Sequence, residues 1–350
     1  MKAAVLEAFG SPMKVHQNWA DPKCGPEDAI IKVAANGVCR SDCHVCDGDW
    51  EWIGLQPELP HVIGHEFCGV VEEIGANVKN YKVGDRVVCP FIFGCGNCSF
   101  CHSGHQNVCI NADLAGFGCS GGYGEFAQVA RADLNLVPLD ESIDFVEAAS
   151  MGCRFMTSFH GIVDQAKVGA GDWVAIHGVG GIGLAATQIA NALGANVVAV
   201  DINDKNLEMA KKMGAVATVN ASSGNVGEAV VEITGGGAHI SVDALGIATT
   251  CLNSIMSLRS RGRHLQIGLT TQAEKGFIAL PIDLMVAREI EFIGTIGMQP
   301  QRYSAMLNMV TSGKLTPGAM VTSVIPVEEA AGVIESMHGF GNVGTTVVKW

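Results

Sequence analysis

An eight-residue stretch, Gly37–His44, brings together side chains that could carry out metal and proton chemistry. It offers a thiol at Cys39, a hydroxyl at Ser41 and an imidazole at His44, and it follows an apolar run, residues 30–35, that is typical of a strand. A small hydroxyl residue after a strand often begins a helix. If Ser41 does so, Ser41 and His44 stand three apart on one helix face, and a proton could pass between them.

A second group consists of four cysteines on a short stretch, at Cys95, Cys98, Cys101 and Cys109. Thiolates at this spacing reach one tetrahedral ion, and four sulfur ligands with no open position suit a structural zinc ion. A metal-free cysteine loop is a weaker explanation, because free thiols are seldom grouped so closely. A zinc-ribbon module for nucleic acid is also disfavoured, because no second cysteine pair stands at ribbon spacing and the chain is acidic.

A third group is spread along the chain, at Cys39, His65 and Cys153, each at the junction of apolar segments. A single histidine before a strand is more often structural than a ligand. Two cysteines and one histidine, however, would leave one tetrahedral zinc position open for substrate. The sequence therefore offers one candidate for a closed metal site and one for an open site.

The glycine-rich stretch Gly178, Gly180 and Gly183 lies between a predicted strand, residues 173–177, and an apolar helix. Asp201 ends the next strand, about 20 residues further on, which is the context that a dinucleotide-binding loop requires. Backbone N–H groups at the helix N-terminus would then meet a pyrophosphate. A glycine turn in an unrelated strand–helix unit is the less favoured alternative.

The elements that must position these groups follow two different patterns of secondary structure along the chain. Short alternating apolar strands separated by turn residues fill the first half and predict a compact, barrel-like β domain. From about Arg154, six apolar strands alternate with helices, which predicts a doubly wound parallel sheet. We assign residues 1–153 and 297–350 to a catalytic domain and 154–296 to a cofactor domain inserted in it. The tail should contain helices at 302–311 and 327–338 and a last strand at 345–350.

The length, net charge and cysteine content of the chain exclude some classes of function. The 350 residues, 48% of them hydrophobic, are enough for two cores. A net charge of −13 argues against a nucleic-acid or anionic-membrane surface. Because Met1–Glu7 carries charge too early for a signal peptide and no run approaches a membrane span, we expect a cytoplasmic protein. Its 13 cysteines are then expected to serve metal binding more than disulfides.

Together these motifs resemble zinc-containing medium-chain alcohol dehydrogenases over essentially the whole chain. The residues that carry the resemblance are Gly37–Asp42, Gly64–Glu66 with Gly69 and Gly75, the four-cysteine stretch, Gly152–Cys153, and the glycine loop with Asp201. The resemblance implies an α/β protein with a GroES-like β-rich catalytic domain and a Rossmann domain. It implies transfer of a hydride between a primary or secondary alcohol, or its aldehyde or ketone, and NAD, with two zinc ions per chain.

The resemblance also implies a role for each matching residue. Cys39, His65 and Cys153 would hold the catalytic zinc, with Glu66 as a neighbouring or transient fourth ligand. Asp42 would orient His65, and Ser41 and His44 would relay the proton. Cofactor contacts would come from Arg40, Gly178, Gly180, Gly181, Ile182, Gly183, Asp201, Lys205, Ala244, Gly268 and Leu269. Trp50, Trp52, Leu55 and Phe91 would line an apolar substrate pocket, although a structural role or a subunit contact explains each tryptophan equally well. Similar compact enzymes are homotetramers, with a homodimer as the alternative.

Two features depart from the family pattern. Thr345 stands where relatives commonly have an arginine or lysine that meets a cofactor phosphate, so the cofactor would depend more on Arg40. Cys43 and Cys46 lie beside the relay at C-x-x-C spacing. Reduced thiols in a helix explain this pair better than metal binding or redox control.

Two other functions remain open from the sequence. A polyol or other specialised alcohol dehydrogenase of the same superfamily would be expected to have a carboxylate in place of Cys153. A reductase-like member would lack a working catalytic zinc, and the complete Cys39, His65 and Cys153 set argues against it. The number of zinc ions per chain separates these alternatives.

Overall fold

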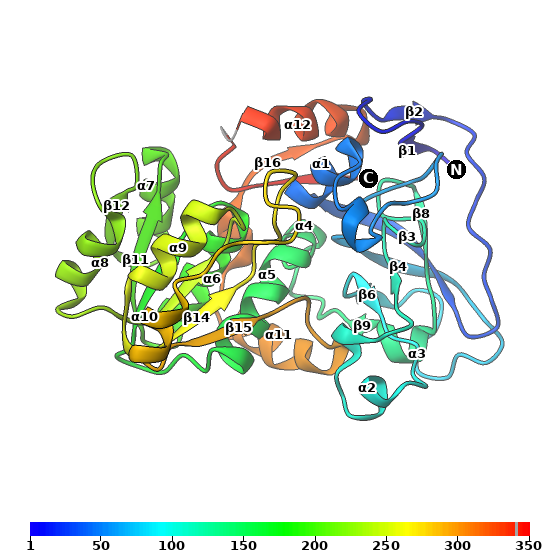
Figure 1. The fold of residues 1–350 in the computed structure, drawn as a ribbon. Coiled ribbons are helices and arrows are strands. Elements are labelled where there is room, and N and C mark those ends of the chain that lie inside the picture. The colour runs from blue at the N-terminus through cyan, green and yellow to red at the C-terminus, as the bar shows by residue number, and fades with distance from the viewer. Residues whose placement is uncertain (340–341) are drawn as a thin grey trace. The chain divides into compact units, whose positions relative to one another are not determined.

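The computed structural model describes residues 1–339 and 342–350, which divide into two compact units (Figure 1). The first unit comprises Met1–Met156 and Gly297–Trp350, and the second comprises Thr157–Ile296. The second unit therefore interrupts the chain of the first. The first crossing lies at Met156, where the sequence analysis set it at residue 153.

A seven-stranded sheet is the frame of the first unit. Its strand β3 (Ala29–Val38) is buried along most of its length and pairs in antiparallel fashion with β4 (Phe67–Ile74), β8 (Phe126–Val129) and β17 (Thr345–Lys349). The other strands of this sheet are β5 (Arg86–Val88), β9 (Val137–Pro138) and β16 (Val321–Ile325). β3 ends just before Cys39 and β4 begins just after Glu66, so this antiparallel pair places both segments at the same end of the two strands.

The remaining elements of the first unit are short. Two small sheets pair β1 (Ala3–Val5) with β2 (Lys14–His16) and β6 (Ile92–Phe93) with β7 (Asp113–Leu114). The helices are α1 (Arg40–Asp47), α2 (Ser99–His102), α3 (Ala132–Asn135), α4 (Phe145–Ser150), α11 (Tyr303–Thr311) and α12 (Ala330–Ser336), and α5 (Cys153–Phe159) crosses the boundary between the units. Single 3₁₀ turns complete the unit at η1 (Glu51–Ile53), η2 (Gln106–Val108), η4 (Pro300–Arg302) and η5 (Pro317–Met320).

The helix predicted over residues 327–338 is present, with a 3₁₀ turn at each end. The segment consists of a 3₁₀ turn η6 (Val327–Glu329), the helix α12, and a second 3₁₀ turn η7 (Met337–Gly339). Tighter i→i+3 turns at both ends satisfy backbone groups that an α-helix leaves unpaired, as in the bond from the Glu329 N–H to the Pro326 carbonyl. The second turn brings His338 into contact with Cys43 and Asp47 of α1.

The second unit contains the predicted parallel sheet, with the strand order β12-β11-β10-β13-β14-β15. Its strands are β10 (Trp173–His177), β11 (Asn196–Asp201), β12 (Ala215–Asn220), β13 (Ala238–Asp243), β14 (Leu258–Gln266) and β15 (Glu291–Gly294). The helices are α6 (Gly181–Ala192), α7 (Asp204–Lys212), α8 (Val226–Thr234), α9 (Ala248–Met256) and α10 (Ile282–Ala287), after a π-helical turn η3 (His160–Gln165). This strand order is that of a Rossmann sheet.

The direction of winding in this sheet reverses at β10. The chain leaves β10 for β11 on one side, and β13 lies on its other side. Open parallel sheets bind ligands beyond the carboxyl ends of the strands at such a reversal. The residues that follow β10 and β13 are therefore the expected cofactor loops.

Each unit has an apolar core of its own. In the first unit the core includes Leu6, Ile63 and Tyr123, and in the second it is built from valines of β11 and α8 together with Ala175. Among residues 1–339 and 342–350, no helix has the length and apolar character needed to cross a membrane.

Candidate active site

The structure brings Cys39, His65, Glu66 and Cys153 together in the first unit. One ligand atom from each residue lies within 4.8 Å of those of the others. Cys39 caps α1, His65 and Glu66 lie in the loop before β4, and Cys153 begins α5. Cys39, His65 and Glu66 are buried and Cys153 is half-buried. Three separate segments of the chain therefore supply one set of donors.

The orientation of His65 fits a metal ligand. Its Nδ1 lies 2.9 Å from the Asp42 carboxylate, which also accepts hydrogen bonds from the Cys39 N–H and the Tyr123 hydroxyl, each at 2.9 Å. The other ring nitrogen, Nε2, is buried and has no hydrogen-bond partner among the residues that the structure describes. A buried polar atom without a partner is costly, and a metal ion at the thiol side of the ring would satisfy it.

The two thiols of this group differ in acidity. A hydrogen bond from Cys153, helped by the nearby His65 ring, holds the pKa of Cys39 well below its usual value. The same hydrogen bond and burial raise the pKa of Cys153. Burial lowers the pKa of His65, but Asp42 outweighs this effect and the pKa is raised. The lowered pKa of Cys39 favours its thiolate, which is the form that binds a metal.

Glu66 has a partner that the sequence analysis missed. The Arg154 Nε donates to Oε1 at 3.0 Å and its Nη2 donates to Oε2 at 2.5 Å, and the Arg154 backbone N–H also donates to Oε1 at 3.1 Å. Both side chains are buried. Burial raises the pKa of Glu66 and Arg154 opposes this shift. The carboxylate is held in place by this ion pair, so metal ligation by Glu66 would require it to leave Arg154.

Aromatic rings surround the imidazole of His65. Phe91 lies edge-on, with ring centroids 5.8 Å apart, and Phe117, which the sequence analysis did not single out, lies at 5.5 Å. Trp50 is buried in the core of the first unit, and Trp52 and Leu55 pack against that core. These contacts favour the structural alternative for Trp50. Phe91 is the predicted pocket residue that lies in contact with the metal-ligand group.

The predicted relay residues lie on α1, with one correction. The helix begins at Arg40 with Cys39 as its N-cap, so Ser41 is already inside the first turn and does not open it. The Cys39 backbone supplies the cap instead, because its N–H bonds to Asp42 three residues later. Ser41 and His44 keep their spacing of three residues. The Nδ1 of His44 lies 2.7 Å from Asp49, and its ring packs 4.7 Å from that of Trp50.

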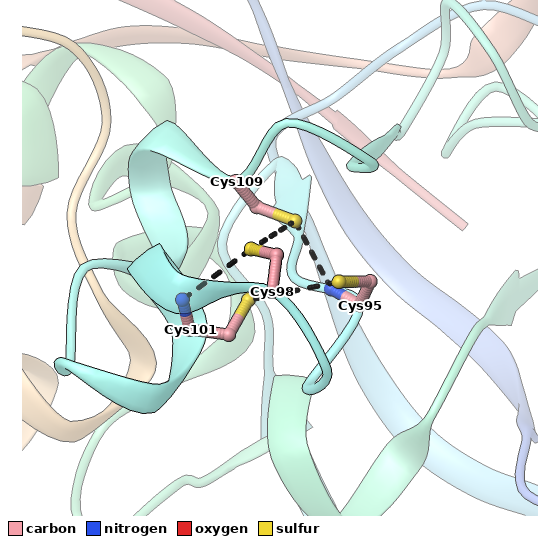
Figure 2. A group of neighbouring side chains, drawn as sticks. All are labelled: Cys95, Cys98, Cys101 and Cys109. Carbon is pink, nitrogen blue, oxygen red and sulfur yellow. Dashed lines mark hydrogen bonds between the residues drawn. The ribbon is translucent and has the colours of Figure 1, made fainter.

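The four cysteines of the predicted structural site also converge (Figure 2). The sulfur atoms of Cys98 and Cys109 are 3.7 Å apart and those of Cys95 and Cys101 are 4.0 Å apart. A tetrahedral zinc with Zn–S bonds of about 2.3 Å holds its sulfurs roughly 3.8 Å apart. The spacing fits a shared ion, and none of these cysteines forms a disulfide.

Backbone N–H groups prepare these sulfurs for a cation. The N–H of Asn97 points to the Cys95 Sγ at 3.4 Å, and the N–H of Cys101 points to the Cys98 Sγ at 3.5 Å. The first of these contacts lowers the pKa of Cys95 to about 6, and the second lowers the pKa of Cys98. Donors aimed at sulfur stabilise the thiolate form that binds zinc.

The glycine loop of the second unit has the backbone that a phosphate requires. Gly178 has φ of 85°, and a Cβ at Gly183 would lie 2.0 Å from the Gly178 carbonyl, so neither position accepts a side chain. No atom lies within 4 Å of a Cβ built at Gly180, which leaves that face of the loop open. Asp201 accepts hydrogen bonds from the N–H groups of Val179 and Asn203, both at 2.8 Å.

The other predicted cofactor residues lie at different places. Ala244 follows β13, and the loop at Gly268 and Leu269 follows β14 and packs closely on Gly246. Lys205 is exposed at the start of α7. Arg40, in the first unit, donates to the Met337 carbonyl at 2.7 Å. Thr345 is buried at the start of β17, so it offers no charge at the position where a basic residue would meet phosphate.

Comparison with known proteins decides the family. Residues 25–141 match the model of the alcohol dehydrogenase GroES-like domain, and residues 181–312 match that of the zinc-binding dehydrogenases. The chain is a zinc-containing medium-chain alcohol dehydrogenase family member. The predicted resemblance and the predicted GroES-like and Rossmann fold are thereby confirmed.

The chain is similar over its whole length to proteins named as alcohol dehydrogenases. It is 35% identical to an alcohol dehydrogenase of Geobacillus stearothermophilus, covering 100% of the chain and 99% of the relative. It is 31% identical to an NAD-dependent alcohol dehydrogenase of Sulfurisphaera tokodaii, covering 99% of each. A crystal structure of an NAD-dependent alcohol dehydrogenase superposes with a TM-score of 0.90 at 30% identity, covering 100% of both chains.

Proposed function

We propose that this protein is an NAD-dependent alcohol dehydrogenase with a catalytic and a structural zinc ion in each chain. The observation that carries the proposal is the buried group of Cys39, His65 and Cys153, in which the unpartnered Nε2 of His65 faces two thiols. Three protein ligands leave the open position that a substrate oxygen needs. The names of the two NAD-dependent relatives and Asp201 at the end of β11 support NAD as cofactor.

The residues around this group account for the chemistry. A zinc ion supplies a Lewis acid that lowers the pKa of an alcohol hydroxyl by several units, and NAD supplies the hydride acceptor. Asp42 keeps the proton of His65 on Nδ1, so that Nε2 stays a ligand. Phe91 and Phe117 cover the ring and exclude water. Ser41 would accept the hydroxyl proton as its own hydroxyl proton passes on toward His44, which Asp49 holds and from which a proton leaves to solvent.

The alternatives are less well supported. A reductase-like protein without catalytic zinc would have no use for a buried imidazole nitrogen lined up with two thiols. A polyol enzyme of the superfamily would be expected to have a carboxylate where this chain has Cys153. The aromatic contacts of His65 favour a primary or secondary alcohol with an apolar body.

Assembly and location are further parts of the proposal. We take the protein to be a homotetramer, with a homodimer as the alternative, by analogy with compact enzymes of the family. All 13 cysteines are free, which suits the reducing conditions of the cytoplasm.

A combined zinc and activity measurement tests the function. The purified protein should contain two zinc ions per chain and reduce NAD with alcohols from a substrate panel. Cys98→Ser should leave one zinc, lower the melting temperature and keep the chemistry of the surviving active molecules, because Cys98 belongs to the four-thiol site. One zinc in the parent protein and no alcohol-dependent NADH absorbance would contradict the proposal, and unchanged metal content and melting temperature in Cys98→Ser would contradict the structural site.

The proposed proton relay through Ser41 and His44 leads to a second prediction. His44→Gln should slow alcohol oxidation by at least about tenfold at pH near 6 to 8, where an external base is scarce, and imidazole buffer should restore part of the rate. His16→Gln removes an imidazole that pairs with Glu7 away from the site and should leave the profile unchanged. If His44→Gln has the pH–rate profile of the parent, His44 does not carry the proton.

A further inference from the structure

A third group of metal-binding side chains lies on the outer side of α1. Cys43 and Asp47 stand four residues apart on this helix and so project from one face. His338 reaches the same place from η7, and one donor atom from each residue lies within 4.8 Å of the other two. We propose that Cys43, Asp47 and His338 form a third metal site, which binds a zinc-like divalent cation.

The distances between the donor atoms fit one shared ion. The Cys43 sulfur lies 3.5 Å from the His338 Nε2 and 3.7 Å from the Asp47 Oδ2. The His338 Nε2 lies 3.1 Å from the Asp47 Oδ1 and 2.9 Å from its Oδ2. A tetrahedral zinc ion with ordinary bonds to sulfur, nitrogen and oxygen holds such atoms roughly 3.4–3.6 Å apart. An entering ion therefore needs only a few tenths of an ångström of adjustment.

The histidine is already turned for ligation. Its Nδ1 lies 2.8 Å from the Glu335 carbonyl oxygen, so the ring proton is held there and Nε2 faces the thiol and the carboxylate. Metal-binding histidines are typically oriented by a hydrogen bond of this kind from their other nitrogen. The geometry of His338 thus resembles that of His65, with a backbone carbonyl in the place of Asp42.

The site is more exposed to solvent than the two others. The side chains of His338 and Asp47 are 52% and 33% exposed, whereas Cys43 is buried beneath them. Water can therefore fill the remaining coordination positions. Cys46, the other half of the C-x-x-C spacing, packs in the core of the first unit and is not part of this group. The proposed co-ligands of Cys43 are therefore Asp47 on the same helix and the sequence-distant His338, and not its C-x-x-C neighbour Cys46.

Protons compete with the metal for this site. The Glu335 carbonyl and the Asp47 carboxylate raise the pKa of His338, and burial with Asp47 raises the pKa of the Cys43 thiol to about 12. Binding must displace these protons, so we expect micromolar affinity at neutral pH and not the tight binding of a structural zinc. A bound ion would link η7 to α1. These two elements are already joined by the hydrogen bond from Arg40 to the Met337 carbonyl.

Titration of the zinc-loaded protein with Co²⁺ tests the proposal. One further Co²⁺ per chain should bind by calorimetry, and a thiolate-to-cobalt charge-transfer band should appear with the same stoichiometry. His338→Gln, a change at an exposed side chain, should weaken this binding by more than about tenfold and weaken the band, and Asp47→Asn should do the same. Cys46→Ser is the matched control and should bind Co²⁺ as the parent does.

Three results would overturn the third site. They are the absence of a further Co²⁺ equivalent, equal binding by His338→Gln and the parent, and loss of binding in Cys46→Ser with retention in Cys43→Ser. Zinc analysis before and after the titration separates added metal from exchange, because exchange at the first two sites releases zinc and occupation of a third does not. The result is independent of alcohol oxidation, so it does not depend on the proposed activity.

Discussion

Replacement of Arg154 by methionine is expected to destabilise the first unit by about 3–5 kcal/mol. Arg154 makes three hydrogen bonds to Glu66, and both side chains are buried. Without the guanidinium, the carboxylate stays buried beside the thiols of Cys39 and Cys153 and loses its ion-pair partner and two of its three hydrogen bonds. Breaking a buried pair on one side costs far more than removing an exposed pair, because the remaining charge has lost its water.

Urea unfolding of the zinc-loaded protein measures this effect. The midpoint for Arg154→Met should fall clearly below that of the parent. Lys14→Met, which breaks an exposed ion pair with Glu7 in the same unit, should leave the midpoint close to that of the parent. The double variant Glu66→Gln with Arg154→Met should recover part of the loss, because it leaves no charge unpaired. An Arg154→Met midpoint equal to that of the parent would show that Glu66 is not held as a buried carboxylate.

The parallel sheet could be predicted closely from sequence. The strand predicted at residues 173–177 agrees with β10 at both ends, and Asp201 ends β11 as predicted, because these strands are runs of apolar, mostly β-branched residues. The ends of the helices were harder to predict from the sequence. α1 begins at Arg40 because the Cys39 backbone bonds to Asp42, and a cysteine is not a usual cap residue. The two 3₁₀ turns around α12 likewise have no strong sequence signal.

The candidate site could be predicted only in part, for a related reason. The sequence marks Cys39, His65 and Cys153 through residue type and local context. It does not mark Arg154 as the partner of Glu66, which lies 88 positions away, or Tyr123 as a partner of Asp42, 81 positions away. Such pairs form only when the fold brings the segments together. For the same reason, His338 could not be connected to Cys43, 295 positions away, before the structure was known.

The protein is expected to use NAD in preference to NADP by at least about a hundredfold in kcat/KM, about 2.7 kcal/mol. Asp201 ends β11 with its carboxylate fixed by the N–H groups of Val179 and Asn203. It can still accept hydrogen bonds from ribose hydroxyls at the carboxyl end of the sheet. A 2′-phosphate there would face this fixed negative charge, and at about 4 Å with an effective dielectric near 20 each unit pair costs about 4 kcal/mol. The attraction between the phosphate and the exposed Lys205 is much weaker than this repulsion.

Steady-state kinetics with both cofactors measure this preference. Asp201→Ser should reduce the NAD:NADP ratio of kcat/KM by at least about tenfold, mainly through a higher KM for NAD and access for NADP, while kcat with saturating NAD changes little. The serine hydroxyl can still accept one of the two backbone bonds, so the glycine loop keeps part of its support, and a melting curve shows whether the second unit stays folded.

Lys205→Ala is the matched control and should change the ratio by less than about threefold, because its exposed amine is screened by solvent. Comparable kcat/KM values for NAD and NADP in the parent would mean that Asp201 does not meet the ribose. A ratio unchanged in Asp201→Ser would place the selectivity on another residue.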